Sequence, residues 1–390
     1  MKHSALKTFV PVLLLGASLA GAGQAQTFHD PHPGTCTLKF KSSSISTGTN
    51  PQTVVVADFN KDGKADFAEV NYSGGGAGSV GVFLGNGDGT FTSKGKFAVG
   101  LGPDGIAAAD VNGDGKLDLV TADDTGSRVS VLLGDGDGTF QTHTDYTTGG
   151  FPHSVALGDF NGDGAPDIAV ANEGDDTVGV LLNNGKGSFG AMKTYATGSE
   201  PYWVTAADLR HNGKTDMVVA QYNAATVGVF LGNGDGTFRT RADYATGTAP
   251  AVVLASDLNG DRKLDLATAN YNNGQTGSVS VLLGNGDGTF LTHTDYTAGT
   301  GPDGLAVGRF EGNRTYDLAV ADLIGNTMSI LPGNGDGTFG APQNFATQEY
   351  PLGIGAGVFK GRNKRKQDLI VTNDLSAAAT LFLNKTRHCE

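Results

Sequence analysis

Acidic and amide side chains recur in short loops at a spacing that could bind a metal ion. In the first such loop, positions 1, 3, 5, 6, 7 and 9 are Asp58, Asn60, Asp62, Gly63, Lys64 and Asp66. Side-chain oxygens at positions 1, 3, 5 and 9, with a backbone carbonyl at position 7, form a set that suits calcium. The glycine permits a sharp bend. Because the set contains no His or Cys, it argues against zinc.

The same pattern returns in register further along the chain. Two more copies are intact, with ligand positions Asp110, Asn112, Asp114, Lys116 and Asp118, and Asp159, Asn161, Asp163, Ala165 and Asp167. A fourth copy keeps its ligands but has Arg262 in place of the glycine, with ligand positions Asp257, Asn259, Asp261, Lys263 and Asp265. One copy alone could be a plain Asx turn. Three intact copies predict three calcium sites, and binding at the fourth loop should be weaker or strained.

Three further copies have lost ligands. Arg210 and Asn212 stand between Asp208 and Asp216 in one of them. Another has the residues Arg309, Glu311, Asn313 and Asp317, and the last retains only Asp368 after a basic run. In these loops we expect Arg or Lys to pair directly with the carboxylates in place of a metal ion.

The loops belong to a long internal repeat of 49 to 52 residues, marked by Pro51, Pro103, Pro152, Pro201, Pro250, Pro302 and Pro351. Each unit contains four short apolar or alternating runs, and the metal-type loop joins the first two. A turn such as GNGDGTF precedes the fourth run. This organisation predicts an all-β fold, a seven-bladed β-propeller of four-stranded blades. We expect the Phe that closes each turn to pack between blades.

The last unit ends without its fourth run, and the segment from Cys36 to Gly48 precedes the first proline as a fourth run would. The N-terminal segment should therefore complete the last blade. Such a closure brings Cys36 near Cys389. A disulfide between these two cysteines is one interpretation, and two unrelated free thiols are the other.

The N-terminus has the features of an export signal. Lys2 and Lys7 precede an apolar stretch from about Phe9 to Ala20, and small residues suit cleavage after Ala25. A transmembrane anchor is the alternative, but the apolar run is short and contains Pro11. We expect a signal peptide at 1–25, a linker at 26–35, a propeller at 36–390, and a secreted or periplasmic protein, which we expect to be a monomer.

The formal net charge of −13 argues against nucleic acid as a partner, because an acidic chain repels the phosphate backbone.

The loops, with following strands such as DLVTA and turns such as LLGNGDGTF, resemble FG-GAP/VCBS repeats from about residue 36 to the end. Such repeats form the integrin α-subunit head and occur in many bacterial exported proteins. The resemblance implies a seven-bladed propeller with calcium in the loops joining strands one and two. It also implies that ligands bind on the opposite face, but it does not identify the ligand.

The residues just after each repeat proline should surround the central channel on that opposite face. Among them, a candidate ligand site consists of Asp104, His153, Tyr202, Trp203 and Asp303. Aromatic rings beside carboxyl groups would suit a sugar. Channel lining without a ligand is the alternative.

Two functions remain open. One is a binding or adhesion module for a carbohydrate or protein ligand, with calcium as a structural cofactor. The other is a carbohydrate-active enzyme, such as a polysaccharide lyase, in which His153, Tyr202 and Asp104 supply acid and base. The sequence contains no Gly-x-Ser-x-Gly motif, zinc signature or phosphate-binding loop that would indicate a different reaction class.

Overall fold

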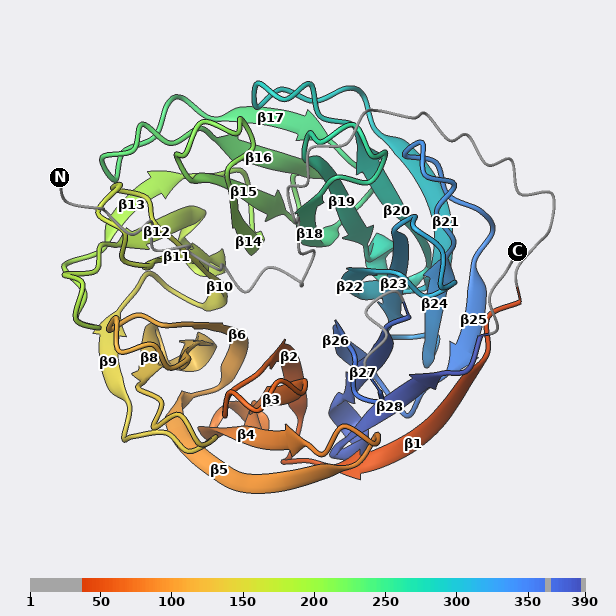
Figure 1. Cartoon of the computed structure of the whole chain (residues 1–390). Coiled ribbons are helices and arrows are strands. Elements are labelled where there is room, and N and C mark those ends of the chain that lie inside the picture. The colour runs from red at the N-terminus through yellow and green to blue at the C-terminus, as the bar shows by residue number, and fades with distance from the viewer. Residues whose placement is uncertain (1–36, 362–365, 387–390) are drawn as a thin grey trace, which may run out of the picture.

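The computed structural model describes residues 37–361 and 366–386, and these residues form a closed ring of seven β-sheets (Figure 1). Each sheet contains four antiparallel strands and is one blade of a propeller, which confirms the predicted fold. The only helical elements in the described ranges are five 3-10 turns, η1 (Ser73–Gly75), η2 (Asp124–Gly126), η3 (Glu173–Asp175), η4 (Asn272–Gly274) and η5 (Asp374–Ser376). None of the described helices is long and apolar enough to cross a membrane.

The innermost strand of each blade begins at a repeat proline and contacts the innermost strands of both neighbouring blades around the channel (Figure 1). Proline fits this position because the first residue of an edge strand need not donate a hydrogen bond to a partner strand. These strands are β2 (Pro51–Ala57), β6 (Pro103–Ala109), β10 (Pro152–Gly158), β14 (Pro201–Ala207), β18 (Pro250–Ser256), β22 (Pro302–Gly308) and β26 (Pro351–Gly357).

The second and third strands form the body of each blade. All six residues of every second strand are buried, because neighbouring blades cover both faces, and this burial explains their nearly continuous apolar sequences. The second strands are β3 (Asp66–Asn71), β7 (Asp118–Asp123), β11 (Asp167–Asn172), β15 (Asp216–Gln221), β19 (Asp265–Asn270), β23 (Asp317–Asp322) and β27 (Asp368–Asn373). The third strands are β4 (Ala77–Gly85), β8 (Arg128–Leu132), β12 (Thr177–Leu181), β16 (Thr226–Phe230), β20 (Thr276–Leu282), β24 (Thr327–Leu331) and β28 (Ala378–Asn384).

The outermost strands carry mostly exposed side chains with a partly buried residue between them, as expected at the edge of a sheet. They are β1 (Phe40–Ser46), β5 (Phe91–Leu101), β9 (Thr144–Thr147), β13 (Lys193–Ala196), β17 (Ala242–Ala245), β21 (Thr294–Thr300) and β25 (Gln343–Ala346).

The hydrophobic core is divided among the gaps between blades. At one of them, Phe140 of the second blade packs edge to face against Phe59 and Phe97 of the first, with ring centroids 5.9 and 5.4 Å apart. Phe140 closes the GDGDGTF turn, so the prediction that this aromatic residue packs between blades is confirmed. Each blade is therefore stabilised by its neighbours rather than by its own sheet alone.

The N-terminal strand closes the ring, as predicted. Strand β1 pairs antiparallel with β28, and the register places Phe40 opposite Asn384 and Ser46 opposite Ala378. The pairing continues beyond the strand, where the Lys385 N–H donates to the Lys39 carbonyl at 2.6 Å. Cys36, Cys389 and the expected signal peptide and linker lie outside the described residues, so those interpretations remain predictions.

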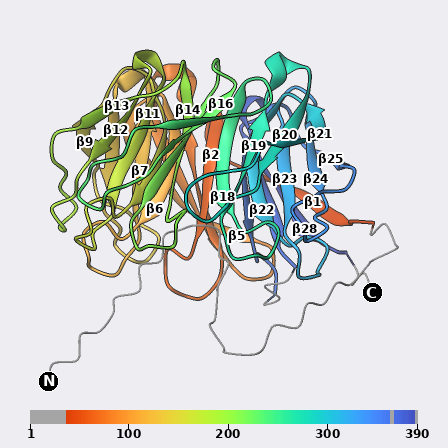
Figure 2. The same ribbon diagram turned by 90° about the horizontal axis from the view of Figure 1, so that it is seen from above.

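The strands run between two faces of the ring (Figure 2). We call the entry face the one where the innermost strands begin and where the 3-10 turns join second to third strands. The exit face holds the loops between first and second strands, which carry the metal-type residues. The entry face holds the pocket described next.

Candidate functional sites on the two faces of the propeller

A hydrogen bond repeated in all seven blades organises the entry face. The residue before each repeat proline has a positive φ, from 49° to 65°. This left-handed turn directs its carbonyl to accept the N–H of the residue that follows the second strand, at 2.8 to 3.0 Å. The acceptor and donor pairs are Asn50 and Tyr72, Gly102 and Asp124, Phe151 and Glu173, Glu200 and Tyr222, Ala249 and Tyr271, Gly301 and Leu323, and Tyr350 and Asp374.

This hydrogen bond places two concentric rings of side chains around the channel. The inner ring consists of the residues after the prolines, namely Gln52, Asp104, His153, Tyr202, Ala251, Asp303 and Leu352. The outer ring consists of the residues after the second strands, namely Tyr72, Asp124, Glu173, Tyr222, Tyr271, Leu323 and Asp374. The seven blades supply equivalent backbone positions with different side chains, so the rings are chemically asymmetric.

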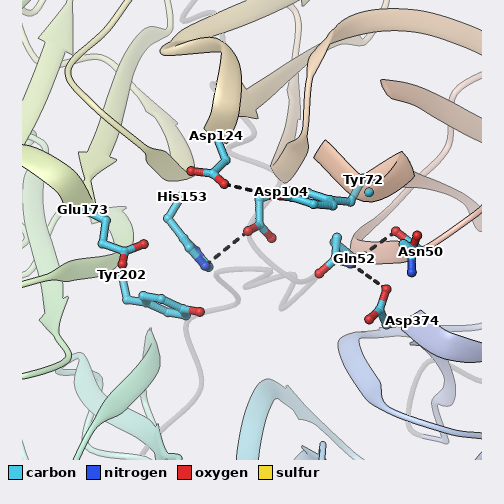
Figure 3. Close-up of a pocket in the computed structure, with 10 residues that line it drawn as sticks. Asn50, Gln52, Tyr72, Asp104, Asp124, His153, Glu173, Tyr202 and Asp374 are labelled. Carbon is cyan, nitrogen blue, oxygen red and sulfur yellow. Dashed lines mark hydrogen bonds and ion pairs between the residues drawn. The ribbon is translucent and has the colours of Figure 1, made fainter. Parts of the chain in front are cut away.

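A pocket of about 380 Å³ lies where the polar members of both rings meet (Figure 3). Its volume falls in the usual range for small-molecule sites, about 300–1,000 Å³. The first, second, third, fourth and seventh blades contribute to it. The lining residues are Asn50, Gln52, Tyr72, Gly74, Asp104, Asp124, His153, Glu173, Tyr202 and Asp374.

His153 and Asp104 face one another within this pocket, and Tyr202 lies beside the imidazole (Figure 3). The distance from His153 Nε2 to Asp104 Oδ2 is 3.3 Å, and the two side chains are 13% and 17% exposed. The Tyr202 ring lies against the imidazole with centroids 3.5 Å apart. On the opposite wall, Gln52 Nε2 donates to Asp374 Oδ1 at 2.9 Å. On both walls, polar side chains thus hold one another in place through direct polar contacts.

The ionisation of the pair is strongly affected by its surroundings. Burial, with added repulsion from Asp124 and Asp374, raises the pKa of Asp104 to about 8. Burial lowers the pKa of His153, although the Glu173 and Asp124 carboxylates oppose that shift. Burial therefore favours the neutral form of both groups, so that a carboxyl group faces an uncharged imidazole across the 3.3 Å contact. Such a pair can both donate and accept a proton.

The structure brings three of the five predicted ligand residues, Asp104, His153 and Tyr202, into the pocket. Asp303 is on the inner ring but not in the lining, and burial together with the Asp104 charge raises its pKa to about 7. Trp203 is turned away from this pocket, because its ring packs against the cores around the fifth blade.

The sequence interpretation missed the outer ring entirely. Tyr72, Asp124, Glu173 and Asp374 line the pocket, yet they follow strands that read only as buried core. One sequence signal could have identified these four residues: each is the first residue after a second strand of six residues. Only the backbone hydrogen bond to the pre-proline carbonyl shows that this position reaches the channel.

On the exit face, the aspartate at loop position 9 has the same role in all seven blades. It is 0–4% exposed, and its two carboxylate oxygens accept backbone N–H groups from loop position 2 and from the end of the third strand. In the first blade these bonds from Phe59 and Gly85 are 2.8 and 2.7 Å. The equivalent acceptors are Asp118, Asp167, Asp216, Asp265, Asp317 and Asp368.

The intact loops share a tight backbone turn. Asp58 accepts the N–H groups of Asp62 at 3.0 Å and Gly63 at 2.8 Å, and Asn60 accepts the Asp62 N–H at 3.1 Å. The loop of the fifth blade keeps this geometry. Its Arg262 has a φ of 70°, where Gly63 of the first blade has a φ of 80°. Within residues 37–361 and 366–386, no three His, Cys, Asp or Glu side chains converge as a ready-made metal site. The loop carboxylates therefore bond mainly to the loop backbone in this structure.

In the fourth blade, loop position 3 holds a cationic side chain, Arg210. The Arg210 guanidinium lies 2.6 Å from Asp216 Oδ1, and the two side chains are 8% and 0% exposed. The predicted direct pairing of an arginine with a loop carboxylate is confirmed there. In the sixth blade the prediction was wrong for Arg309, which instead lies over the Tyr316 ring at 4.7 Å from its centroid. Asp317 there accepts the backbone N–H groups of Phe310 and Glu311.

Comparisons with known proteins agree with this architecture. A model of the FG-GAP-like repeat matches residues 70–121, 110–170, 159–219, 211–268 and 257–320. A search of curated proteins found no match. Several solved propellers superpose on most of the chain.

A streptogramin B lyase is 13% identical, with a TM-score of 0.59 over 89% of this chain and 98% of that chain. BBS1N in a complex with ARL6DN is 13% identical, with a TM-score of 0.59 over 90% and 99%. A putative 6-phosphogluconolactonase from Bacteroides uniformis is 15% identical, with a TM-score of 0.61 over 77% and 87%. At these identities the similarity shows a shared fold alone.

Proposed function

Because the chain belongs to the FG-GAP-like repeat family, we propose that it is an exported binding protein that holds a carbohydrate in its entry-face pocket. Calcium in the exit-face loops would stabilise the propeller. The family match extends over more than half of the chain. The carbohydrate ligand and the calcium ions are what we propose beyond this match.

The observation that carries the ligand proposal is the density of oriented polar groups in the pocket. Amides of Asn50 and Gln52, hydroxyls of Tyr72 and Tyr202, and four carboxyl groups converge on one cavity. Sugars present hydroxyl groups in all directions, so they are recognised by just such a mixture of donors and acceptors.

A glycan array probed with the whole protein tests this function. We expect binding to at least one glycan, weakened at least tenfold by His153→Ala and by Gln52→Ala. Asp137→Asn is a matched control, because Asp137 is an exposed turn residue outside the pocket. Absence of any glycan binding by the folded protein, or equal loss in the control, would exclude the proposal, and capture of a protein ligand through the same residues would redirect it.

A second candidate, a carbohydrate-active enzyme, is favoured by the Asp104–His153 pair. One of its members can donate a proton to a leaving group while the other accepts one from a nucleophile. Product analysis on any glycan that binds separates the two functions. Chain cleavage that disappears in His153→Ala, with binding retained, supports an enzyme, whereas binding without new chain ends supports a binding module.

The calcium proposal rests on the similarity between the intact loops and the Arg210 site. In the fourth blade a positive charge beside the position-9 carboxylate is supplied by the protein itself. In the first blade the loop lysine, Lys64, pairs with Asp62 at 2.9 Å and not with Asp66, and burial with repulsion from Asp58 and Asp62 raises the pKa of Asp66 to about 6. A divalent ion held by the loop oxygens would remove this repulsion. The fitting ligands are those at positions 1, 3, 5, 7 and 9 of the first, second, third and fifth loops.

Export and a Cys36–Cys389 disulfide complete the proposal. The last described residues on each side support the pairing, because the Lys39 N–H donates to Thr386 Oγ1 at 3.1 Å. The described residues nearest to the two cysteines thus belong to adjacent segments of one blade. Thiol titration of the secreted protein before and after reduction tests the disulfide, and two free thiols in the unreduced protein would rule it out.

A further inference from the structure

We propose that the carbohydrate bound in the entry-face pocket carries free amino groups, which are positively charged at neutral pH. The inference rests on the proposed carbohydrate-binding function and specifies its ligand class. It comes from the charge and the chemical type of the groups that surround the cavity.

Acids are the largest group among the described residues that line the pocket, and no permanent cation is among them. Four of its ten lining residues are carboxylic, Asp104, Asp124, Glu173 and Asp374, and none of the ten is Lys or Arg. The one basic side chain, His153, is held near its neutral form by burial. A site lined in this way attracts cations and repels anions.

The carboxyl groups also act on one another. Repulsion from Asp124 and Asp374 adds to the burial effect that raises the pKa of Asp104. After burial, nearby acids including Glu200 and Asp124 contribute to a raised pKa of Glu173. An ammonium group among them would favour the charged carboxylates, so binding should release protons to solvent.

The rest of the lining distinguishes an amino sugar from a lysine or arginine side chain. A long basic side chain is best held where apolar groups cover its methylene stem. This lining instead contains amides and tyrosine hydroxyls, and no aliphatic side chain. Polyhydroxylated rings can use those amides and hydroxyls, whereas an aliphatic stem cannot.

The negative charge of the pocket also limits which substrates an enzyme with this site could bind. A lyase that acts on uronic acids must bind a carboxylate next to the proton it removes, and such a site needs compensating cations. The four carboxyl groups of this pocket oppose that substrate. A hydrolase or binding protein for cationic glycans is compatible with the same residues.

The test compares two tetramers with the same sugar backbone, a glucosamine tetramer with free amines and the fully N-acetylated tetramer, in which neutral acetamido groups replace the charged amines. Isothermal titration calorimetry at pH 7 should show at least tenfold tighter binding of the amine form. Its binding enthalpy should vary with the ionisation enthalpy of the buffer, which reports proton release. The double variant Asp124→Asn/Glu173→Gln should lose most of this preference. Glu349→Gln, an exposed acid outside the pocket lining, should retain it.

The outcomes separate this inference from the function on which it rests. Tighter binding of the acetylated or another neutral glycan through His153 and Gln52 would retain carbohydrate binding and overturn the amine preference. Binding of neither tetramer, with no glycan bound on an array, would overturn both. Competition by polylysine but by no glucosamine oligomer would overturn the inference in favour of a basic peptide.

Discussion

Arg210 and Asp216 form a buried ion pair, 2.6 Å apart, in a loop whose counterparts in the first, second and third blades have Asn at the position of Arg210. Arg210 also donates to the Gly232 carbonyl at 2.6 Å, so the guanidinium links the loop to the end of the third strand. One blade is thus stabilised by a cation that belongs to the protein.

Removal of Arg210 should therefore be costly. Arg210→Ala leaves the fully buried Asp216 carboxylate without its ionic partner, and such losses cost about 3–5 kcal/mol. We expect a clear fall in the free energy of unfolding measured by denaturant titration. Arg239→Ala, at an exposed residue of the same blade, serves as the control and should change stability by less than about 0.5 kcal/mol.

The double variant Arg210→Asn/Asn212→Asp restores the ligand pattern of the intact loops. We expect it to be less stable than the wild type in a chelator and to recover in millimolar calcium, with one additional ion bound per chain. Calcium content by mass spectrometry under native conditions measures the gain. An unchanged ion count would show that the loop pattern alone does not make a site.

Calcium removal should destabilise the wild-type protein. A ligand at 100 times its dissociation constant adds about 2.7 kcal/mol per site, so chelation should lower the melting temperature by several degrees. Asp114→Ala removes position 5 of the second loop and should reduce the calcium-dependent part of the shift. Asp137→Ala, in a turn of the same blade, should leave that part intact, and a melting curve unmoved by chelation would contradict calcium binding.

Glu69 should make stability depend on pH. It is fully buried in β3, Asn71 Nδ2 donates to its Oε1 at 3.1 Å, and burial raises its pKa to about 7. The native state therefore holds a proton that the unfolded chain loses above about pH 4.5, so the contribution of Glu69 to stability falls as the pH rises from about 4.5 to 7 and is constant above that.

Glu69→Gln keeps the shape and removes this titration. We expect the variant to exceed the wild type in free energy of unfolding by up to about 3 kcal/mol at pH 8, and the difference to shrink towards pH 4.5. Denaturant titrations at several pH values measure the difference. A difference independent of pH would show that Glu69 does not titrate as stated.

Two substitutions at equivalent pre-proline positions should have opposite effects. Gly102 has φ 60°, and an added Cβ would lie 2.7 Å from Thr125 Oγ1 and 3.0 Å from the Tyr72 ring. Gly102→Ala should cost about 1–2 kcal/mol and weaken ligand binding, because Tyr72 and Asp124 both line the pocket. Ala249→Gly relieves the same backbone conformation in the fifth blade and should add up to about 1 kcal/mol without affecting binding. Thermal melts and ligand titrations of both variants measure these effects.

The sequence by itself determined the architecture. The repeat prolines, the four apolar runs and the missing fourth run of the last unit predicted seven blades and their closure, since strand periodicity and turn residues are local properties. It also identified Asp104, His153 and Tyr202, because a residue after an innermost proline must face the channel in any propeller. It correctly anticipated that Arg210 would pair with a loop carboxylate.

Tertiary structure alone decided the remaining features. Asp124 and Glu173 follow buried strands and have no distinguishing neighbours in sequence, and only the bond from their N–H groups to carbonyls more than twenty residues earlier brings them to the pocket. The spacing marks the position-9 aspartates as candidate metal ligands, but only the structure shows that each also accepts two backbone N–H groups beneath the loop. Trp203 and Arg309 found partners within the core that no spacing rule specifies. Such contacts depend on how blades stack, and stacking is a property of the assembled ring.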